Sequence, residues 1–425
     1  MRNGDSPSKS LISIEDALSA TPAEVAGWVE HLNPGIALIL RLLDFDRVFR
    51  KAEGVCLWDS EGNEYLDFQS NYGSLSLGHN HPRVLASINA VGAAPNFVQW
   101  ISYAPLSAAL AANLASVTPG DLSNSYLCNS GAEATEAALK LARAATGRTH
   151  IISTHNSFHG KTMGALSVTG REAYRKPLEP LLAGVTFVPF GELDPLDEAL
   201  RAQPTAAFIV EPIQGEGGVI VPPEGYLREA ARLCRDHGAL FILDEIQTGL
   251  GRTGRLFACQ WENVRPDAMI LGKALSGGFY PVSAFVADEA VMGVFKPGDH
   301  GSTFGGNPLG AAIGRAALRV LIEEKLADRA RELGDWFMGE LRKIESPAIR
   351  EVRGKGLLIG VELTGPARPY CEALAERGIL CKETHDLVLR FAPPLVVAKA
   401  DLEWALPHIA EVLAMSFEPE MAGAR

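Results

Sequence analysis

The sequence predicts an α/β protein, with a mainly parallel seven-stranded sheet in a large domain and a smaller α+β domain built from both termini. Three observations support this prediction. Short apolar runs bounded by turn residues recur, helical stretches separate several of them, and the composition turns helical after residue 308. The expected strands are 125–128, 150–153, 185–188, 206–210, 239–243, 268–271 and 282–286.

The remaining elements follow in order. The stretch 21–24 (TPAE) has the cap residue, the proline and the glutamate of a helix start. Residues 55–68 predict two strands joined by a turn, 354–363 a strand-like segment and 401–415 a closing helix. The expected division is 1–95 as an N-terminal segment and part of the small domain, 96–308 as the large domain, and 309–425 as the C-terminal part of the small domain.

Composition excludes several classes of partner. The chain has 425 residues, is 47% hydrophobic and carries a formal charge of −12 with no long basic run. These values argue against nucleic acid or an anionic membrane as the main partner. Six cysteines without a C-x-x-C pair, no apolar signal core at the start and no membrane-length apolar run predict a reduced, cytoplasmic protein.

Two charged residues follow two of the predicted strands. Asp244 comes directly after the run 239–243, and Lys273 follows the run 268–271 after one glycine. Taken singly, such an acid is usually a turn residue and such a lysine a surface charge. Together, at the sheet edge where ligands bind, they suit pyridoxal phosphate. The amine would form a Schiff base with its aldehyde, and the carboxylate would pair with its protonated ring nitrogen.

Two motifs carry a family resemblance. DEIQTGLGRTG at 244–254, followed by LGKALSGGFYP at 271–281, resembles the class III pyridoxal-phosphate aminotransferases, the relatives of ornithine, acetylornithine and putrescine aminotransferases. The likeness runs from about residue 55 to about residue 395. It implies the fold type I architecture, pyridoxal 5′-phosphate as cofactor, and a homodimer with its active sites at the interface.

Further residues are candidates for binding the cofactor together with Asp244 and Lys273. Ser130, Gly131 and Ala132 precede a strong helix, whose free N–H groups would bind an anion; a simple serine cap is the alternative. Beside Asp244 and Lys273 the cofactor phosphate is the better interpretation, and the family binds phosphate at this motif. The resemblance also implies the other cofactor contacts: Phe158 covering the ring, His159 and Glu211 beside it, Gln247 at the ring hydroxyl, and Thr303 at the neighbouring subunit's phosphate.

Substrate contacts are expected at four residues. By resemblance, Glu216 pairs with Arg390 when no substrate carboxylate is present, and Arg390 binds that carboxylate when it arrives. Lys161 stands where ornithine-type and acetylornithine-type relatives carry arginine, as in the putrescine-type branch. No tyrosine occurs from 35 to 50, where ornithine-specific relatives place one. Both differences weaken recognition of a donor α-carboxylate and favour a terminal amine on a diamine or another ω-amino compound, and Trp100 would also permit a hydrophobic chain.

Two patterns are interpreted as structural. The stretch 249–254 fits G-x-G-x-x-G but lacks a following helix, so we expect a tight loop rather than a dinucleotide site. His79 and His81 have no nearby third ligand, so we expect a turn before a helix and no metal site.

The predicted reaction is a ping-pong transamination from an ω-amino donor of the diamine, ornithine or acetylornithine type to a 2-oxo acid, with 2-oxoglutarate expected. Lys273 would transfer the proton as general base and acid. Two alternatives stay open. One is an aminomutase of the glutamate-1-semialdehyde type, which would not require an oxo acid. The other is a non-catalytic binding or scaffold protein, which the presence of Lys273 and Asp244 disfavours.

Overall fold

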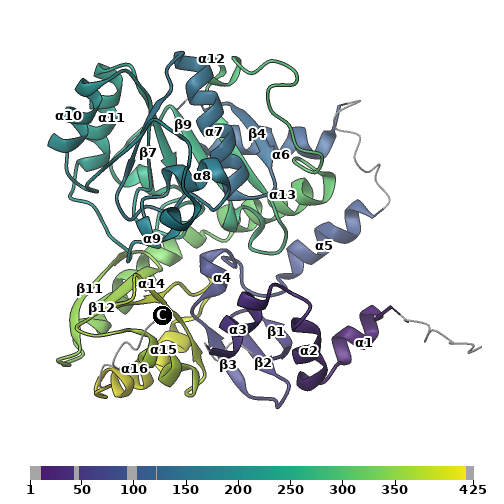
Figure 1. Cartoon of the computed structure of the whole chain (residues 1–425). Helices are drawn as coiled ribbons and strands as arrows, with labels where there is room; N and C mark the ends of the chain where they lie inside the picture. The colour runs from purple at the N-terminus through teal and green to yellow at the C-terminus, as the bar shows by residue number, and fades with distance from the viewer. Residues whose placement is uncertain (1–10, 43–46, 93–102, 121, 418–425) are drawn as a thin grey trace, which may run out of the picture.

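The computed structural model describes residues 11–42, 47–92, 103–120 and 122–417. The described chain forms a large domain around a seven-stranded sheet and a smaller part that contains two four-stranded sheets. Figure 1 shows the large domain above and the smaller part below, where purple strands from the N-terminal part of the chain lie beside yellow-green segments from its C-terminal part. In the described residues no helix is both long and apolar enough to cross a bilayer.

The large sheet contains every strand that the apolar runs predict. Its strands are β4 (Asn124–Cys128), β5 (His150–Thr154), β6 (Val185–Val188), β7 (Thr205–Val210), β8 (Leu240–Asp244), β9 (Ala268–Leu271) and β10 (Ser283–Ala287). Their spatial order is β4-β10-β9-β8-β7-β5-β6; β10 pairs antiparallel with β4 and β9, and the other described pairings of this sheet are parallel. The predicted mainly parallel sheet is therefore confirmed.

Helices cover the large sheet because its strands are apolar on both faces. Every residue of β5, β7, β9 and β10 is buried, as expected for strands that lie between two helical layers. The helices of this part are α6 (Pro105–Val117), α7 (Gly131–Thr146), α8 (Met163–Val168), α9 (Glu172–Arg175), α10 (Asp194–Ala202), α11 (Tyr226–Asp236), α12 (Glu289–Met292) and α13 (Pro308–Glu323).

The smaller part joins both ends of the chain. One sheet has the order β1 (Phe49–Glu53), β2 (Cys56–Asp59), β3 (Glu64–Asp67), β13 (Ile379–Leu380). The other has the order β11 (Ile349–Lys355), β12 (Leu358–Leu363), β15 (Val388–Phe391), β14 (Lys382–Thr384). The parallel pairing of β13 with β3 places Ile379 opposite Leu66, so an N-terminal sheet is completed by a C-terminal strand.

Helices also surround the two small sheets. They are α1 (Ile14–Ser19), α2 (Pro22–Val29), α3 (Pro34–Leu42), α4 (Ser70–Gly73), α5 (Pro82–Val91), α14 (Leu326–Leu341), α15 (Arg368–Ala375) and α16 (Lys399–Leu413). The predicted capping box is present at α2, where Thr21 and Glu24 exchange hydrogen bonds. The region around His79 forms the turn before α5, and His79 contacts Asp67 at 2.9 Å rather than a second histidine.

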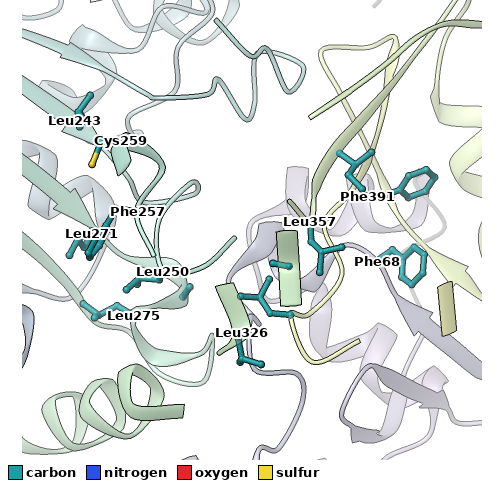
Figure 2. Close-up of a cluster of buried hydrophobic side chains, with 14 of the residues drawn as sticks. Phe68, Leu243, Leu250, Phe257, Cys259, Leu271, Leu275, Leu326, Leu357 and Phe391 are labelled. Carbon is teal, nitrogen blue, oxygen red and sulfur yellow. The ribbon is translucent and has the colours of Figure 1, made fainter. Parts of the chain in front are cut away.

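One hydrophobic cluster extends from the large domain into the smaller part. Leu243 and Leu271, from the central strands, belong to the same cluster as Phe68 and Phe391 (Figure 2). Phe68 lies edge-on to Phe391, with their ring centroids 6.1 Å apart. Because Phe391 ends the strand that carries Arg390, this packing attaches a site residue of the smaller part to the core.

Candidate active site

The predicted site residues follow the carboxyl ends of adjacent strands. Asp244 is the last residue of β8, and Lys273 follows β9 after one glycine. The two strands pair in parallel, with Asp244 opposite Ile270. Glu211 follows β7, the neighbour of β8 on its other side. The large sheet thus places an amine and two carboxylates at one edge, where open α/β sheets bind their ligands.

Lys273 combines a strained backbone with a buried amine. Its φ of 40° lies in the left-handed region, where a non-glycine residue is uncommon and strained. Burial lowers the pKa of the Lys273 amine; the negative charge of Glu216 opposes this shift, and the positive charge of Arg390 adds to it. An amine with a lowered pKa is more often neutral near pH 7, and the neutral form is the nucleophile.

Asp244 is held by two contacts. One carboxylate oxygen lies 2.7 Å from His159 Nδ1, and the other accepts a hydrogen bond of 3.0 Å from the Ile246 backbone N–H. The His159 side chain is fully buried, and its Nε2 has no partner among the described residues. His159 therefore orients the carboxylate through Nδ1 and leaves Nε2 facing the interior.

Glu211 connects two loops of the site. Its Oε1 accepts a hydrogen bond of 2.9 Å from the Phe158 N–H, and its Oε2 accepts one of 3.1 Å from the Gly215 N–H. Burial raises the pKa of Glu211 to about 7, the nearby charge of Asp244 contributes to the increase, and His159 opposes it. Both oxygens are thus used within the protein, so the contacts of Glu211 support the loops that carry Phe158 and Glu216.

The start of α7 has the geometry expected of an anion site. Ser130 caps this helix, its Oγ accepting a hydrogen bond of 3.2 Å from the Glu133 N–H. The N–H groups of Gly131 and Ala132 follow in the first turn, where the helix dipole favours an anion. A Cβ on Gly131 would lie 2.6 Å from Ile246 Cδ1, so glycine lets the loop after β8 approach the helix start.

Arg390 and Glu216 form the predicted ion pair. Arg390 Nη1 donates to Glu216 Oε1 at 2.5 Å, and the Arg390 side chain is only 3% exposed. Burial by itself would raise the pKa of Glu216, but the charges of Arg390 and Lys273 outweigh it and lower this pKa to about 2. The second terminal nitrogen of Arg390 has no partner among the described residues.

Gln247 links the loop after β8 to a strained turn. Its Nε2 donates a hydrogen bond of 3.3 Å to the Tyr72 carbonyl, while its buried Oε1 has no hydrogen-bond partner in the described chain. Tyr72 lies in a turn where Ser70, Asn71 and Tyr72 all have positive φ, and its ring centroid is 5.6 Å from Arg390 Cζ. Gln247 therefore lies where a bound ring could use its free oxygen.

Other predicted residues lie nearer the surface or outside the described structure. Lys161 is exposed, with its Nζ 4.4 Å from the centre of the Tyr174 ring. Phe158 is half-buried and lies edge-on to the same ring. Thr303 is exposed, next to Ser302, whose Oγ accepts a hydrogen bond of 2.9 Å from Asn129. Trp100 lies outside the described residues.

The donor set fits pyridoxal phosphate. Lys273 offers an amine for an aldehyde, Asp244 a carboxylate for a ring nitrogen, and α7 an anion site for a phosphate. Among the residues of this site, three buried polar atoms also lack a partner in the described structure: His159 Nε2, Gln247 Oε1 and Arg390 Nη2. A polar group buried without a partner is unfavourable, so these atoms favour a polar ligand. Fold and site together define a fold type I pyridoxal-phosphate enzyme.

Comparison with known proteins identifies the family. The family model described as aminotransferase class-III matches residues 43–413. An ornithine aminotransferase of Bacillus subtilis is 48% identical over 374 residues, 86% of this chain and 92% of that protein. A crystal structure of the ornithine aminotransferase from Toxoplasma gondii has a TM-score of 0.84 at 38% identity, covering 92% of this chain and 98% of that one.

A further solved structure widens the comparison. An (S)-enantioselective ω-transaminase from Thermomicrobium roseum has a TM-score of 0.87 at 31% identity, covering 92% of this chain and 98% of that one. The chain belongs to the class III aminotransferases. It is an aminotransferase that uses pyridoxal phosphate, so the scaffold alternative is wrong and the predictions of family, fold class and cofactor are confirmed.

Some residues of the site were not predicted from the sequence. Tyr72 approaches Arg390 from a turn that only the folded structure brings there. Arg252, within the glycine-rich stretch interpreted as a loop, is fully buried and contacts both parts of the molecule. Arg171 and Tyr174 lie beside Lys161. The only sequence signal was a cluster of basic and aromatic residues after 170, which is equally typical of a solvated helix.

Proposed function

We propose that this protein moves the ω-amino group of a donor of the diamine, ornithine or acetylornithine type to a 2-oxo acid, 2-oxoglutarate, in two half-reactions at one site. The Arg390–Glu216 pair close to Lys273 carries this proposal. An arginine that exchanges a protein carboxylate for a substrate carboxylate lets one site accept first an ω-amine and then an oxo acid. The ornithine aminotransferases among the relatives support the donor class.

The residues of the chain would perform the proton transfer. The cofactor supplies a ring that withdraws electrons from the reacting carbon. Lys273 Nζ accepts a proton from the carbon that bears the donor's amino group and later returns a proton to the acceptor's carbon. Asp244, oriented by His159, provides the negative charge that keeps the ring nitrogen protonated.

The Arg390–Glu216 pair would adapt the site to each substrate. With an ω-amine near Lys273, the pair stays closed and neutralises its own charges. When the oxo acid arrives, its carboxylate takes the place of Glu216 and gains two parallel hydrogen bonds from the guanidinium. Glu216 then moves away from Arg390 without a proton, because its pKa is about 2 and it stays charged in either position.

We also infer a homodimer with its sites at the interface. Exposed apolar side chains occur on α3, where Ile36, Leu38 and Ile39 are 50 to 57% exposed. Phe304, which follows the exposed Thr303, is 59% exposed. Large apolar side chains gathered at two places favour burial against another copy of the chain.

A half-reaction screen tests the proposed function. The purified yellow enzyme is mixed, without an acceptor, with ornithine, acetylornithine, putrescine, cadaverine or 4-aminobutyrate, and the visible absorbance is followed. We expect bleaching by an ω-amine and recovery of the colour on adding 2-oxoglutarate. Isomerisation of a substrate without an oxo acid would support the aminomutase instead, and no bleaching by any of these amines would refute the proposed donor class.

A further inference from the structure

A cluster of charged and aromatic side chains lies next to Phe158. It consists of Lys161, Arg171, Tyr174 and Asp386, and we call it the Tyr174 cluster. Lys161 follows the Phe158 loop, Arg171 and Tyr174 lie at α9, and Asp386 lies in the turn between β14 and β15. Lys161 and Arg171 therefore meet at the Tyr174 ring, and Asp386, from a segment far away in the sequence, contacts Arg171.

Two cations lie against that ring. Lys161 Nζ is 4.4 Å and Arg171 Cζ is 5.0 Å from its centroid. Arg171 Nη1 also donates a hydrogen bond of 3.4 Å to the Tyr174 hydroxyl. Since the face of an aromatic ring attracts cations, Tyr174 holds both side chains in place and leaves their outer N–H groups available.

The positive charge of the cluster is not balanced. Arg171 Nη2 lies 3.5 Å from Asp386, whose side chain is 82% exposed, and such an exposed pair contributes little. Lys161 has no ion pair with any carboxylate of the described residues. Of the two cations only Arg171 is paired, with one solvated carboxylate, and a ligand carboxylate can replace Asp386 on the guanidinium.

The cluster borders the active site on two sides. Phe158, the residue expected to cover the cofactor ring, lies edge-on to Tyr174 with a centroid separation of 6.1 Å. On the other side Thr384, at the end of β14, donates a hydrogen bond of 2.9 Å to the Glu216 carbonyl. The turn that carries Asp386 follows directly. A substrate whose amine reaches Lys273 would thus have its far end near these cations.

We propose that the Tyr174 cluster binds the carboxylate of an ω-amino acid donor, with Arg171 as the main contact and Lys161 as a second charge. The inference rests on the proposed function and deepens it, because it selects a donor with a distal carboxylate over a diamine. A lysine at 161 offers only a point charge, whereas the guanidinium of Arg171 offers the planar fork that matches a carboxylate.

The test compares two donors that differ by the carboxylate. Half-reactions of wild-type and Arg171→Ala holoenzyme are followed by cofactor absorbance with ornithine and with putrescine. Loss of the charged contact should raise the ornithine concentration for half-saturation about 10- to 100-fold. The value for putrescine, which lacks the carboxylate, should stay the same or fall, and recovery with 2-oxoglutarate should be unchanged.

Two further variants keep the test interpretable. Arg175→Ala, on the same helix, removes a cation that lies over Phe187 rather than Tyr174, and both donors should react as in the wild type. Asp386→Asn removes the competing carboxylate, so half-saturation with ornithine should fall about two- to threefold. If Arg171→Ala does not fold, Asp386→Asn still tests the same contact, because it should lower rather than raise the ornithine concentration for half-saturation.

The outcomes separate the two proposals. Equal losses for ornithine and putrescine in Arg171→Ala, or no loss for either, would overturn the role of the cluster. Failure of the wild type to react with any amine would instead refute the proposed function. In that case calorimetric titration of ornithine into wild type and Arg171→Ala still decides whether the cluster binds it.

Discussion

Within the site, the pKa values of two glutamates shift in opposite directions because their hydrogen-bond partners differ. Glu216 contacts a guanidinium, and its pKa falls to about 2. Glu211, which is more deeply buried in the same region, accepts only backbone hydrogen bonds, and its pKa rises to about 7. Desolvation acts on both carboxylates, and only a cation in direct contact reverses it.

Lys273→Ala should abolish turnover and remove the visible absorbance that the lysine-bound cofactor gives. The amine that bonds to the aldehyde and moves the proton would be absent, so a loss of at least about 10³-fold is expected. Absorbance spectra and steady-state rates measure both effects, with Lys355→Ala, a lysine that lies over Trp261, as the control. An unchanged spectrum would refute the assignment of Lys273.

Arg390→Gln should weaken the acceptor half-reaction more than the donor half-reaction. Removing the bidentate partner of the oxo-acid carboxylate should raise the 2-oxoglutarate concentration for half-saturation about 10- to 100-fold. Arg350→Gln, on β11 of the same sheet, removes an exposed arginine that pairs with Glu362 and should change neither half-reaction. Equal effects on both half-reactions of Arg390→Gln would contradict the proposed exchange of carboxylates.

Glu211→Gln should change the pH dependence of stability. Because the folded-state pKa of Glu211 is raised to about 7 from 4.5, the folded chain holds this proton more tightly, and stability decreases as pH rises between these values. The variant should lose less stability over this window, by on the order of 2 kcal/mol. Thermal unfolding midpoints at pH 5 and pH 8 measure the difference, and parallel curves for both proteins would exclude it.

On the scale of elements, the loop after β8 shows how one buried side chain can connect several segments. Arg252 is 1% exposed, and it donates hydrogen bonds to the carbonyls of Leu357, Pro393 and Gly73. Burial lowers its pKa to about 9, and no carboxylate of the described chain forms an ion pair with it. Arg252 therefore joins the large domain to the turns beside Tyr72 and Arg390.

Arg252→Met should destabilise the protein by about 2–4 kcal/mol, because three buried carbonyls would lose their donor. Urea denaturation of the cofactor-loaded protein measures this loss. The control is Arg255→Met in the same loop, where the exposed arginine lies over Trp261 and should contribute less than about 0.5 kcal/mol. Similar losses in the two variants would show that the contacts of Arg252 are not responsible.

For the molecule as a whole, the site needs both parts of the chain. The large sheet provides Lys273, Asp244 and Glu211 at its carboxyl edge, and the smaller part provides Arg390 on β15. The continuous hydrophobic cluster that contains Leu271 and Phe391 connects them (Figure 2). Motion between the parts would therefore change the position of the carboxylate contact relative to the amine.

For the molecule as a whole we also predict a homodimer. Sedimentation velocity of the cofactor-loaded protein should give twice the mass of one chain, because the exposed apolar residues of α3 and the exposed Phe304 would be buried. Phe304→Asp should shift the equilibrium towards single chains and reduce cofactor retention, with Phe49→Asp, on the exposed face of β1, as the control. A single-chain mass for the wild type at micromolar concentration would contradict the homodimer.

The sequence by itself determined the strands of the large sheet, the start of α7 and the placement of Asp244 and Lys273 at strand ends. These features depend on short-range patterns: apolar runs, caps and turn residues act within a few positions. It also supported the family, the fold class and the cofactor, which the comparisons confirm. The domain limits at 95 and 308 and the roles of the single site residues stay predictions.

Only the tertiary structure decided which distant side chains meet. His159 contacts Asp244 across 85 positions, Arg390 contacts Glu216 across 174, and Arg171 reaches Asp386 from another part of the chain. Such contacts depend on the order of strands in the sheets and on how the smaller part packs against the large domain. No local pattern encodes them, because the free energy that selects them comes from burial shared over the whole hydrophobic core.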